Sequence, residues 1–518
     1  MIDLTVAQIA DIVGGTLADI SPQDAAQRRV TGTVEFDSRA VGPGGLFLAL
    51  PGAHVDGHDY AASAAAAGAV AVLAARPVGV PAIVVAPERS PAEGALAGVL
   101  EHDADGSGAA VLAALAKLAK AVAAELVAGG LTIIGITGSS GKTSTKDLVA
   151  AVLEPLGVVV APPGSFNNEL GHPWTVLRAG RDTDYLVLEM SARHPGNIAA
   201  LAEIATPAVG VVLNVGTAHL GEFGSREAIA RTKSELPQAV PQSGVVILNA
   251  DDPAVAAMAE VTAARVVRVS RGSTGDVWAG PVSLDELARP QFTVHAGATQ
   301  AEVRLGVYGD HQVANALCAA AVALECGATL DQVATALGGA GPVSRHRMQV
   351  TTRADGVTVI DDAYNANPDS MRAGLQALAW IAHGGSGTGS DLPVKRRSWA
   401  VLGEMAELGA DAIAEHDRVG RLAVRLDVSR LVVVGTGRSL SAMHHGAVLE
   451  GAWGAGADRG AVNVADADAA LELLRAEVQP GDVILVKASN SAGLGALADA
   501  LVSDGPAGGA GNRGSAHP

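Results

Sequence analysis

The sequence has few aromatic residues, and this limits what can fill its hydrophobic cores. Phe, Trp and Tyr together make up 3% of the 518 residues, whereas apolar residues as a whole make up 49%. A chain of this length is expected to form three or four domains. Their interiors must therefore be built from Ala, Val, Leu and Ile.

Cysteine is almost absent, which argues against a secreted, disulfide-linked protein. The two cysteines, Cys318 and Cys326, lie in an apolar stretch with helical character and without the spacing of metal ligands. Chains of this size that depend on disulfides carry more cysteines and are secreted. We therefore predict two free thiols and a cytoplasmic protein.

Basic charge and long apolar runs are also scarce. The net charge is −18, from 54 acidic and 36 basic residues. A nucleic-acid-binding protein needs a basic face, so we expect no nucleic-acid partner. The longest apolar run, residues 61–75, is too short to span a bilayer, and no basic-then-apolar signal opens the chain. We expect a monomer without stable membrane insertion.

A strand, a glycine loop and a helix follow one another in residues 131–150. The β-branched run 132–134 predicts a buried strand, and the sequence TGSSGKTS follows at 137–144. In such a loop glycines let backbone N–H groups surround phosphate oxygens, while Lys142 reaches the outer phosphates and Thr143 holds Mg²⁺. The residues expected to bind a nucleotide here are Gly138, Ser139, Ser140, Gly141, Lys142, Thr143 and Ser144.

One position departs from the strict phosphate-loop pattern. The glycine expected five residues before Gly141 is replaced by Ile136, and Gly135 is one place off. An ordinary glycine turn between strand and helix is the alternative interpretation. The Lys-Thr-Ser sequence at the start of the helix favours a variant phosphate loop.

The pattern of strands and helices predicts an α/β protein of three domains. Residues 1–107 form a smaller N-terminal α/β domain, residues 108–341 a central domain and residues 342–504 a Rossmann-like α/β domain, with a disordered tail at 505–518. Strands alternate with helices in the central part, which predicts a mostly parallel sheet with helices on both faces. Residues 431–437 resemble the start of a dinucleotide fingerprint, but we expect a simple strand and turn without a helix opening after them.

Several polar residues follow predicted strands of the central domain, where function gathers in such sheets. Glu189 ends the strand 185–188 and suits Mg²⁺, although a solvated or capping carboxylate is equally consistent. Asn249 ends another strand, where it could equally form a turn. Taken alone, His219 in a loop and Lys233 in a helix are ordinary surface residues. Asn315 lies in an apolar helix and needs a partner, either a backbone carbonyl or a base edge.

Two further segments carry unusual polar runs. Asp37-Ser38-Arg39 could cap a turn or hold a phosphate, and the residues alone leave both open. The sequence DDAYNANPDSM, at 361–371, follows a predicted strand and is dense in amides and carboxylates. Random composition rarely produces such a run.

Taken together, these motifs resemble those of the Mur ligase family. TGSSGKTS, EMSARHPG, NVGTAHLGEFGS, RTKSEL, LNADDP and GDHQVANAL occur in the family's order, and the resemblance covers about residues 34–495. The family consists of ATP-dependent amide-forming enzymes of peptidoglycan precursor synthesis. Within it, DDAYNANPDSM, LGEMAELG and SFNNELGHP point to the member that joins D-alanyl-D-alanine to UDP-N-acetylmuramoyl-tripeptide.

The resemblance assigns roles to individual residues. It implies a catalytic set of Lys142, Glu189, His219 and Lys233, and two Mg²⁺ sites made by Thr143, Glu189, His219 and a carbamylated Lys233. The residues it places against ATP outside the phosphate loop are Asn249, Asn315, Arg347 and Asp362. The residues it places against the substrates are Ser38 and Arg39 for the uridine diphosphate, Asn167 and Asn168 for the precursor, and Asn365, Asn367 and Ser370 for the dipeptide.

The resemblance implies an acyl-phosphate mechanism, in which ATP activates the terminal carboxylate of the tripeptide before the dipeptide amine attacks. Two residues depart from the family's usual pattern: Asn490 replaces an arginine, and Ser191 replaces a small residue, usually glycine. Two rival functions are weighed against this one. They are another amide ligase of the superfamily, such as one acting on muramoyl peptides or folate, and a phosphate-loop ATPase that forms no bond.

Overall fold

A computed structural model describes most of the chain. The described residues are 1–52, 55–87, 103, 105–162, 164–216, 220–385, 395–451 and 460–504. The predicted metal ligand His219 and the tail 505–518 lie outside them. Among the described helices, none combines the length and the apolar character needed to cross a bilayer.

The N-terminal part contains a five-stranded sheet in the order β2-β7-β6-β5-β4. Its strands are β2 (Thr16–Ala18), β4 (Val34–Glu35), β5 (Gly45–Leu48), β6 (Ala69–Ala74) and β7 (Ala82–Val84). Strands β4 to β7 are parallel and β2 is antiparallel to β7. The helices are α1 (Val6–Val13), α2 (Pro22–Gln27) and α3 (Ala61–Ala67), and a short ladder pairs β1 (Leu4–Thr5) with β3 (Arg29–Val30). This is the predicted small α/β unit.

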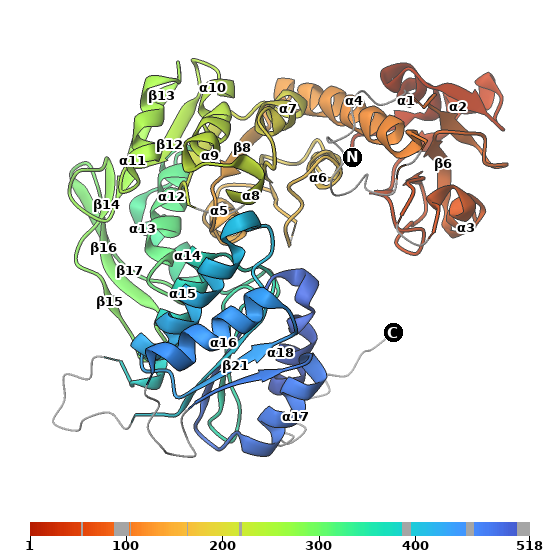
Figure 1. Ribbon diagram of the computed structural model, residues 1–518. Coiled ribbons are helices and arrows are strands. Elements are labelled where there is room, and N and C mark those ends of the chain that lie inside the picture. The colour runs from red at the N-terminus through yellow and green to blue at the C-terminus, as the bar shows by residue number, and fades with distance from the viewer. Residues whose placement is uncertain are drawn as a thin grey trace, which may run out of the picture.

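A long helix, α4 (Ser107–Ala128), joins this part to the rest of the molecule (Figure 1). Its N-terminus is held by Asp103, whose carboxylate accepts hydrogen bonds from the backbone N–H groups of Gly108 and Ala109, both at 2.8 Å. A carboxylate at this end satisfies N–H groups that have no partner within the helix and favours the helix dipole.

The central sheet runs in the order β15-β16-β14-β13-β12-β11-β8-β10-β9, with β17 beside β16. Strands β8 to β14 are parallel, and β15 to β17 form an antiparallel extension. The strands are β8 (Thr132–Thr137), β9 (Val159–Val160), β10 (Tyr185–Glu189), β11 (Val209–Val212), β12 (Val245–Asn249), β13 (Arg265–Ser270), β14 (Val277–Ala279), β15 (Ser283–Leu284), β16 (Pro290–Ala296) and β17 (Thr299–Arg304).

Helices cover both faces of this sheet. On one face α5 (Lys142–Leu153), α12 (Gln312–Glu325) and α13 (Leu330–Gly339) pack against the side chains of Ile134 and Ile136. On the other, α7 (Asn197–Ile204) and α10 (Glu235–Ala239) pack against Val212 and Val246. Alternate residues of each strand point to opposite faces, so strands buried on both sides read as continuous apolar runs. The prediction of a mostly parallel, doubly covered sheet is confirmed.

The C-terminal part holds a six-stranded sheet in the order β18-β19-β23-β20-β21-β22. Its strands are β18 (Gln349–Thr352), β19 (Thr358–Asp361), β20 (Ser398–Leu402), β21 (Arg430–Val434), β22 (Gly460–Val464) and β23 (Val483–Lys487). All neighbours are parallel except β18 and β19. Helices α14 (Pro368–Ala382), α15 (Ala412–Arg425) and α16 (Arg438–Glu450) pack on one face, and α17 (Ala467–Glu477) and α18 (Leu494–Ser503) on the other.

The Rossmann-like third part is thus confirmed, with one correction. Helix α16 begins at Arg438, directly after Gly437, so the expectation of a turn without a helix opening is wrong. The backbone of Gly437 has φ 127°, a conformation that glycine adopts readily, which allows the sharp entry into the helix.

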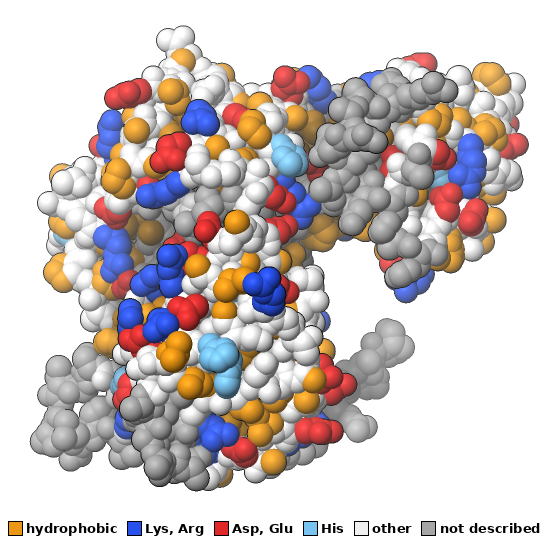
Figure 2. All heavy atoms as spheres, in the orientation of Figure 1, with side chains coloured by type: hydrophobic (Ala, Val, Ile, Leu, Met, Phe, Trp, Pro, Cys, Tyr) orange, Lys and Arg blue, Asp and Glu red, His pale blue; other side chains and the backbone are white. Residues whose placement is uncertain are grey.

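The three parts lie along an arc. Figure 1 shows the C-terminal part beside the central one, with the N-terminal part at the far end of α4. On the face shown in Figure 2, Lys and Arg side chains are interspersed with Asp and Glu side chains, and no continuous basic surface is visible there. An anionic ligand bound on this face would therefore depend on local groups.

Candidate active site

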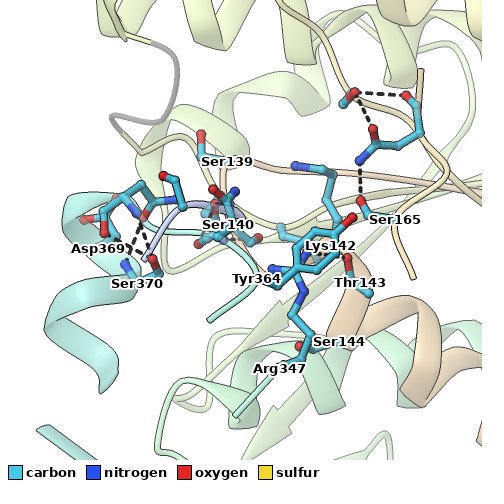
Figure 3. A pocket seen from close by; sticks show the side chains of 18 of the residues that line it. Ser139, Ser140, Lys142, Thr143, Ser144, Ser165, Arg347, Tyr364, Asp369 and Ser370 are labelled. Atoms are coloured by element: carbon cyan, nitrogen blue, oxygen red, sulfur yellow. Dashed lines mark hydrogen bonds between the residues drawn. The ribbon is translucent and has the colours of Figure 1, made fainter. Parts of the chain in front are cut away.

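A cavity of about 680 Å³ lies between loops of the central part and loops of the C-terminal part (Figure 3). The central part contributes the loop after β8, the loop after β10 and the segment 165–169, and the C-terminal part contributes the loops after β19, β20 and β23. The predicted site residues that line it are Ser139, Ser140, Gly141, Lys142, Thr143, Ser144, Asn167, Asn168, Asn315, Arg347, Asp362, Asn365, Asn367 and Ser370.

The predicted phosphate loop has the backbone that phosphate binding needs. Gly141 has φ 83°, and a Cβ added there would lie 2.7 Å from Oδ1 of Asn315. Only glycine therefore fits between the loop and α12. Lys142 follows as the first residue of α5, and its Nζ donates to the carbonyl of Gly138 at 2.8 Å.

The end of β11 holds the outer side of the loop. The Asn214 side chain accepts from Ser140 N–H at 3.0 Å and donates to the Ser140 carbonyl at 3.1 Å. The N–H of Gly216 donates to Ser139 Oγ at 2.9 Å. These bonds fix the loop before any ligand is bound.

Glu189 lies at the end of β10, buried behind the cavity residues Thr143, Ser165 and Asn167. Its Oε2 accepts hydrogen bonds from Thr143 Oγ1 at 3.2 Å, Ser165 Oγ at 3.1 Å and Asn167 Nδ2 at 3.4 Å. Its buried Oε1 has no hydrogen-bond partner among the described residues. A hydroxyl and an unsatisfied carboxylate oxygen are ligands that Mg²⁺ prefers, so the residues present fit this ion.

Two lysines, the half-buried Lys142 and the buried Lys233, lie on the central side near Glu189. Burial lowers the pKa of Lys142, an effect opposed by Glu189 and reinforced by Arg347. Burial lowers the pKa of Lys233 much further, and the charge of Lys142 adds to the effect. Lys233 ends helix α9 (Arg226–Lys233), whose N-terminus is capped by Ser225. The surroundings of Lys233 therefore favour a neutral amine over an ammonium ion.

The C-terminal side of the cavity contains a buried ion pair. Lys487 Nζ lies 2.6 Å from Asp362 Oδ2 and donates to the Asn365 carbonyl at 2.8 Å. The other oxygen of Asp362 accepts from Met348 N–H at 3.1 Å. Burial lowers the pKa of Lys487, while Asp362 opposes this shift.

Arg347 connects the two sides. Its guanidinium lies 4.1 Å from the centre of the Tyr364 ring, and its Nη2 donates to Thr143 Oγ1 at 3.2 Å. Figure 3 shows Arg347 and Tyr364 next to Thr143. A positive charge of the C-terminal part thus reaches the hydroxyl predicted to bind Mg²⁺.

Models of one family match three segments of the chain. "Mur ligase middle domain" matches residues 136–323, "Mur ligase, glutamate ligase domain" matches 346–490, and "Mur ligase family, catalytic domain" matches 32–120. The chain belongs to the Mur ligase family.

Curated relatives of this Mur ligase are similar over its whole length. The UDP-N-acetylmuramoyl-tripeptide–D-alanyl-D-alanine ligase of Mycobacterium tuberculosis is 82% identical over 511 residues, which is 97% of this chain and 98% of the relative. The enzyme of the same name from Escherichia coli is 33% identical and covers 98% of this chain and 100% of itself.

Two solved structures share its architecture. MurF from Acinetobacter baumannii matches with a TM-score of 0.77 at 29% identity, covering 97% of this chain and 99% of that one. MurF ligase from Thermotoga maritima in complex with ADP matches with a TM-score of 0.69 at 26% identity, covering 92% and 98%.

Some predicted site residues of this Mur ligase do not line the cavity. Glu189 and Lys233 are buried. Asn249 is also buried, and its Nδ2 donates to the Leu213 carbonyl at 2.9 Å, which holds two strand ends together. Ser38 and Arg39 lie on the N-terminal part, where Arg39 pairs with Asp37 at 2.8 Å and lowers the pKa of Asp37 to about 2.

Two of the predicted dipeptide residues also form a helix cap. Asn367 Oδ1 accepts from Ser370 N–H at 2.9 Å, and Ser370 Oγ accepts from Asn367 N–H at 3.0 Å, as in a capping box. Part of the DDAYNANPDSM sequence is therefore explained by the start of α14.

The N-terminal part is joined to the central part through an indole ring. Trp174 of α6 (Gly171–Val176) donates from Nε1 to the Val34 carbonyl at 2.8 Å and lies 5.8 Å from the Phe36 ring. Arg178 stacks over the same indole at 4.0 Å. This contact ties the strand before Ser38 to the helix that follows Asn167 and Asn168.

Sequence reasoning missed several cavity residues. Arg193 and Glu407 line the cavity and form an ion pair of 3.1 Å, and Ser165, Tyr364 and Lys487 also line it. All five lie within or beside motifs that had been recognised. Ser165 follows β9, and the signal available for the other four was their place at or after the ends of β10, β19, β20 and β23, where a parallel sheet gathers its functional groups.

Proposed function

We propose that this chain is an ATP-dependent ligase that joins D-alanyl-D-alanine to UDP-N-acetylmuramoyl-tripeptide in peptidoglycan precursor synthesis. The observation that carries the proposal is a single cavity in which Lys142 and Thr143 face the loop 361–371 of the C-terminal part. A phosphate loop alone would suit any ATPase. Its pairing with a second, amide-rich wall suits an enzyme that must hold two further substrates.

The first step activates a carboxylate, which is a poor electrophile. The terminal carboxylate oxygen of the tripeptide attacks the γ-phosphorus of ATP, and the bond to the β,γ-bridging oxygen breaks, giving an acyl phosphate and ADP. Lys142 offsets the charge on the transferring group, and the N–H groups of the loop hold the phosphates. Asn315, Arg347 and Asp362 are assigned to the nucleotide.

The second step forms the amide. The dipeptide amine attacks the acyl carbon, and inorganic phosphate leaves from the tetrahedral intermediate as the nitrogen loses a proton. The protein's task here is alignment, and orientation of bound reactants can supply roughly 7–11 kcal/mol of the barrier. Asn365, Asn367 and Ser370 are assigned to the dipeptide side.

The remaining substrate contacts follow the length of the precursor. Asn167 and Asn168, beside Glu189, are assigned to its peptide end, and Ser38 and Arg39 to its uridine diphosphate end. Arg39 must then exchange its contact with Asp37 for one with a phosphate.

Two Mg²⁺ ions are part of the proposal. Thr143 and Glu189 would hold one, and His219 with a carbamylated Lys233 would complete the second. When bound, they supply positive charge that offsets the negative charge of the phosphates.

Carbamylation of Lys233 is supported by its burial and its neighbour. CO₂ reacts only with a neutral amine, and both burial and Lys142 lower the pKa of Lys233. The N–C bond forms with loss of one proton and turns the neutral amine into an anion near the positive charge of Lys142.

Lys233 can be tested with ¹³C-labelled bicarbonate. The unaltered chain is expected to show one carbamate resonance by ¹³C NMR at neutral pH, and Lys233→Arg should lack it while keeping its fold. A spectrum without that resonance in the unaltered, magnesium-loaded protein would count against the modification.

The proposed activity is tested by mass spectrometry of the product made from UDP-N-acetylmuramoyl-tripeptide, ATP and D-alanyl-D-alanine. The expected product has gained one dipeptide and lost one water, with one phosphate released per product. Phosphate release that needs no muramoyl precursor would support an ATPase instead. Incorporation of other amino acids but not the dipeptide would support another ligase of the family.

We also propose that the enzyme is a cytoplasmic monomer.

A further inference from the structure

Two glycines from different parts of the chain touch each other beside the cavity. Gly221 belongs to α8 (Leu220–Phe223) of the central part, and Gly409 begins the short 3-10 helix η3 (Gly409–Asp411) of the C-terminal part. A Cβ added to Gly221 would lie 2.6 Å from the backbone N of Gly409, and one added to Gly409 would lie 2.6 Å from the Cα of Gly221. Real Cβ atoms essentially never come that close to backbone, so this contact needs glycine on both sides.

The positions of these glycines link them to the reaction. Gly221 is two residues after His219, which we assign to a metal site. Gly409 is two residues after Glu407, which lines the cavity. The contact therefore joins the end of the metal-binding loop to the end of a loop on the opposite wall.

An ion pair lies next to this contact. Arg193 Nη2 of the central part is 3.1 Å from Glu407 Oε1 of the C-terminal part. Glu407 has φ 64°, a left-handed conformation that is unfavourable for a non-glycine residue. Such a conformation persists only where its surroundings hold it, and these residues are often at functional sites.

A third contact continues the same seam. A Cβ on Gly216 would lie 2.3 Å from Asp369 Oδ2 of α14 and 3.3 Å from Ser139 Cβ. Figure 3 shows Asp369 near Ser139 and Ser140. The chain after β11 therefore approaches the C-terminal part closely at two described positions, Gly216 and Gly221.

We propose that the Gly221–Gly409 contact, with the Arg193–Glu407 ion pair, is a docking point that positions the dipeptide-binding wall against the acyl phosphate. This inference rests on the proposed function. The glycines act as positioning residues: they let two loops meet without side chains between them. Their effect falls on the amide-forming step, while nucleotide binding depends mainly on the loop around Lys142.

Gly221→Ala is the sharpest test. Alanine favours a helix, and Gly221 does not have a positive φ, so the added methyl group collides only with the C-terminal part. Ordinary contact is 3.4–4 Å, so the walls must separate by about 1 Å, and a displacement of that size can lower the rate about 10²-fold. Gly339→Ala is the matched control, because Gly339 ends helix α13 and a Cβ there has no neighbour within 4 Å.

The kinetics should separate positioning from general damage. For Gly221→Ala we expect kcat to fall about 10- to 100-fold and KM for D-alanyl-D-alanine to rise. The Kd for ADP and the Tm should match those of Gly339→Ala. Equal kcat and KM in the two variants would overturn this inference but leave the proposed function intact. Absence of product with the unaltered chain would overturn the proposed function, and this inference with it.

The ion pair offers a second, independent measurement should Gly221→Ala fold poorly. Glu407→Arg is expected to lower kcat by placing two arginines together. The double variant Arg193→Glu/Glu407→Arg restores opposite charges and should recover most of that loss. A double variant no more active than Glu407→Arg would overturn the role given to this pair.

Discussion

The two sides of the cavity differ in whether their lysines are paired with a carboxylate. On the C-terminal side, Lys487 is matched by Asp362 at 2.6 Å. On the central side, Lys142 donates to a carbonyl, and neither Lys142 nor Lys233 forms an ion pair with a carboxylate of a described residue. The pKa values of all three lysines are lowered by burial. Glu189 opposes this shift at Lys142 through its charge alone, whereas Asp362 opposes it at Lys487 through its charge and a hydrogen bond, and at Lys233 the charge of Lys142 adds to the shift.

This difference indicates that the paired lysine stabilises the protein, whereas the unpaired lysines are available to a ligand. A buried cation without a counter-ion is costly, so such a group either loses its proton, as the surroundings of Lys233 favour, or lies where a ligand can supply the missing charge. The central side thus has room for the negative charge of a triphosphate. On the C-terminal side the charge of Lys487 is already matched by Asp362, and this ion pair, with the hydrogen bond from Lys487 to the Asn365 carbonyl, orders the loop 361–371.

The largest effect is expected from Lys142→Ala. Loss of this charge should lower ATP-dependent amide formation by about 10³-fold, because no other group replaces it at the transferring phosphate. The Tm should not fall, since burial opposes the charge of Lys142. Lys117→Ala, an exposed lysine of α4, should keep full activity. An active Lys142→Ala enzyme would refute the site.

Breaking the paired side should instead reduce stability. Asp362→Asn leaves Lys487 buried without its counter-ion. We expect the free energy of unfolding to fall by roughly 3–5 kcal/mol, the usual cost of breaking a buried ion pair. The measurement is the urea midpoint of the unaltered chain and the variant. Replacing both residues, as in Asp362→Asn/Lys487→Met, should recover most of the loss. A single variant as stable as the parent would show that the pair contributes little.

His172 tests whether a depressed pKa alone marks a ligand site. Burial lowers the pKa of His172 to about 4, and the nearby backbone of Glu189 and Leu201 opposes this shift. Neither ring nitrogen is within hydrogen-bonding geometry of a partner among the described residues. His172 lies in α6 behind Asn168, outside the cavity lining. Its effect should therefore be on stability and not on substrate binding.

The sign of the effect follows from linkage. Above pH 6.5 the imidazole is neutral in both states; as the pH falls from 6.5 to about 4, only the unfolded chain takes up the proton. The free energy of unfolding should thus decrease by about 3 kcal/mol across this window. His172→Leu should show a flatter pH profile, with unchanged KM for ATP. Parallel profiles for the two proteins would contradict the assignment.

Local patterns predicted most of the fold. The phosphate loop was recognisable without its first glycine because Gly141, Lys142 and Thr143 have a fixed spacing at a strand–helix junction. The sheets followed from apolar runs that alternate with helical patterns. Contacts between parts of the chain could not be predicted in this way: the hydrogen bond of Asn249 to a neighbouring strand end and the pairing of Arg193 with Glu407 depend on how distant segments dock.

The hydrogen bond from Trp174 to the Val34 carbonyl has a consequence for substrate length. It fastens the segment that carries Ser38 and Arg39 to the helix that follows Asn167 and Asn168, so the gap between these two groups is built into the protein as a ruler. On the assignments proposed above for these residues, a precursor one residue shorter or longer would place its end carboxylate away from the γ-phosphate even with its uridine diphosphate in place. Selection of peptide length would then follow from a fixed distance within the protein and not from recognition of each residue.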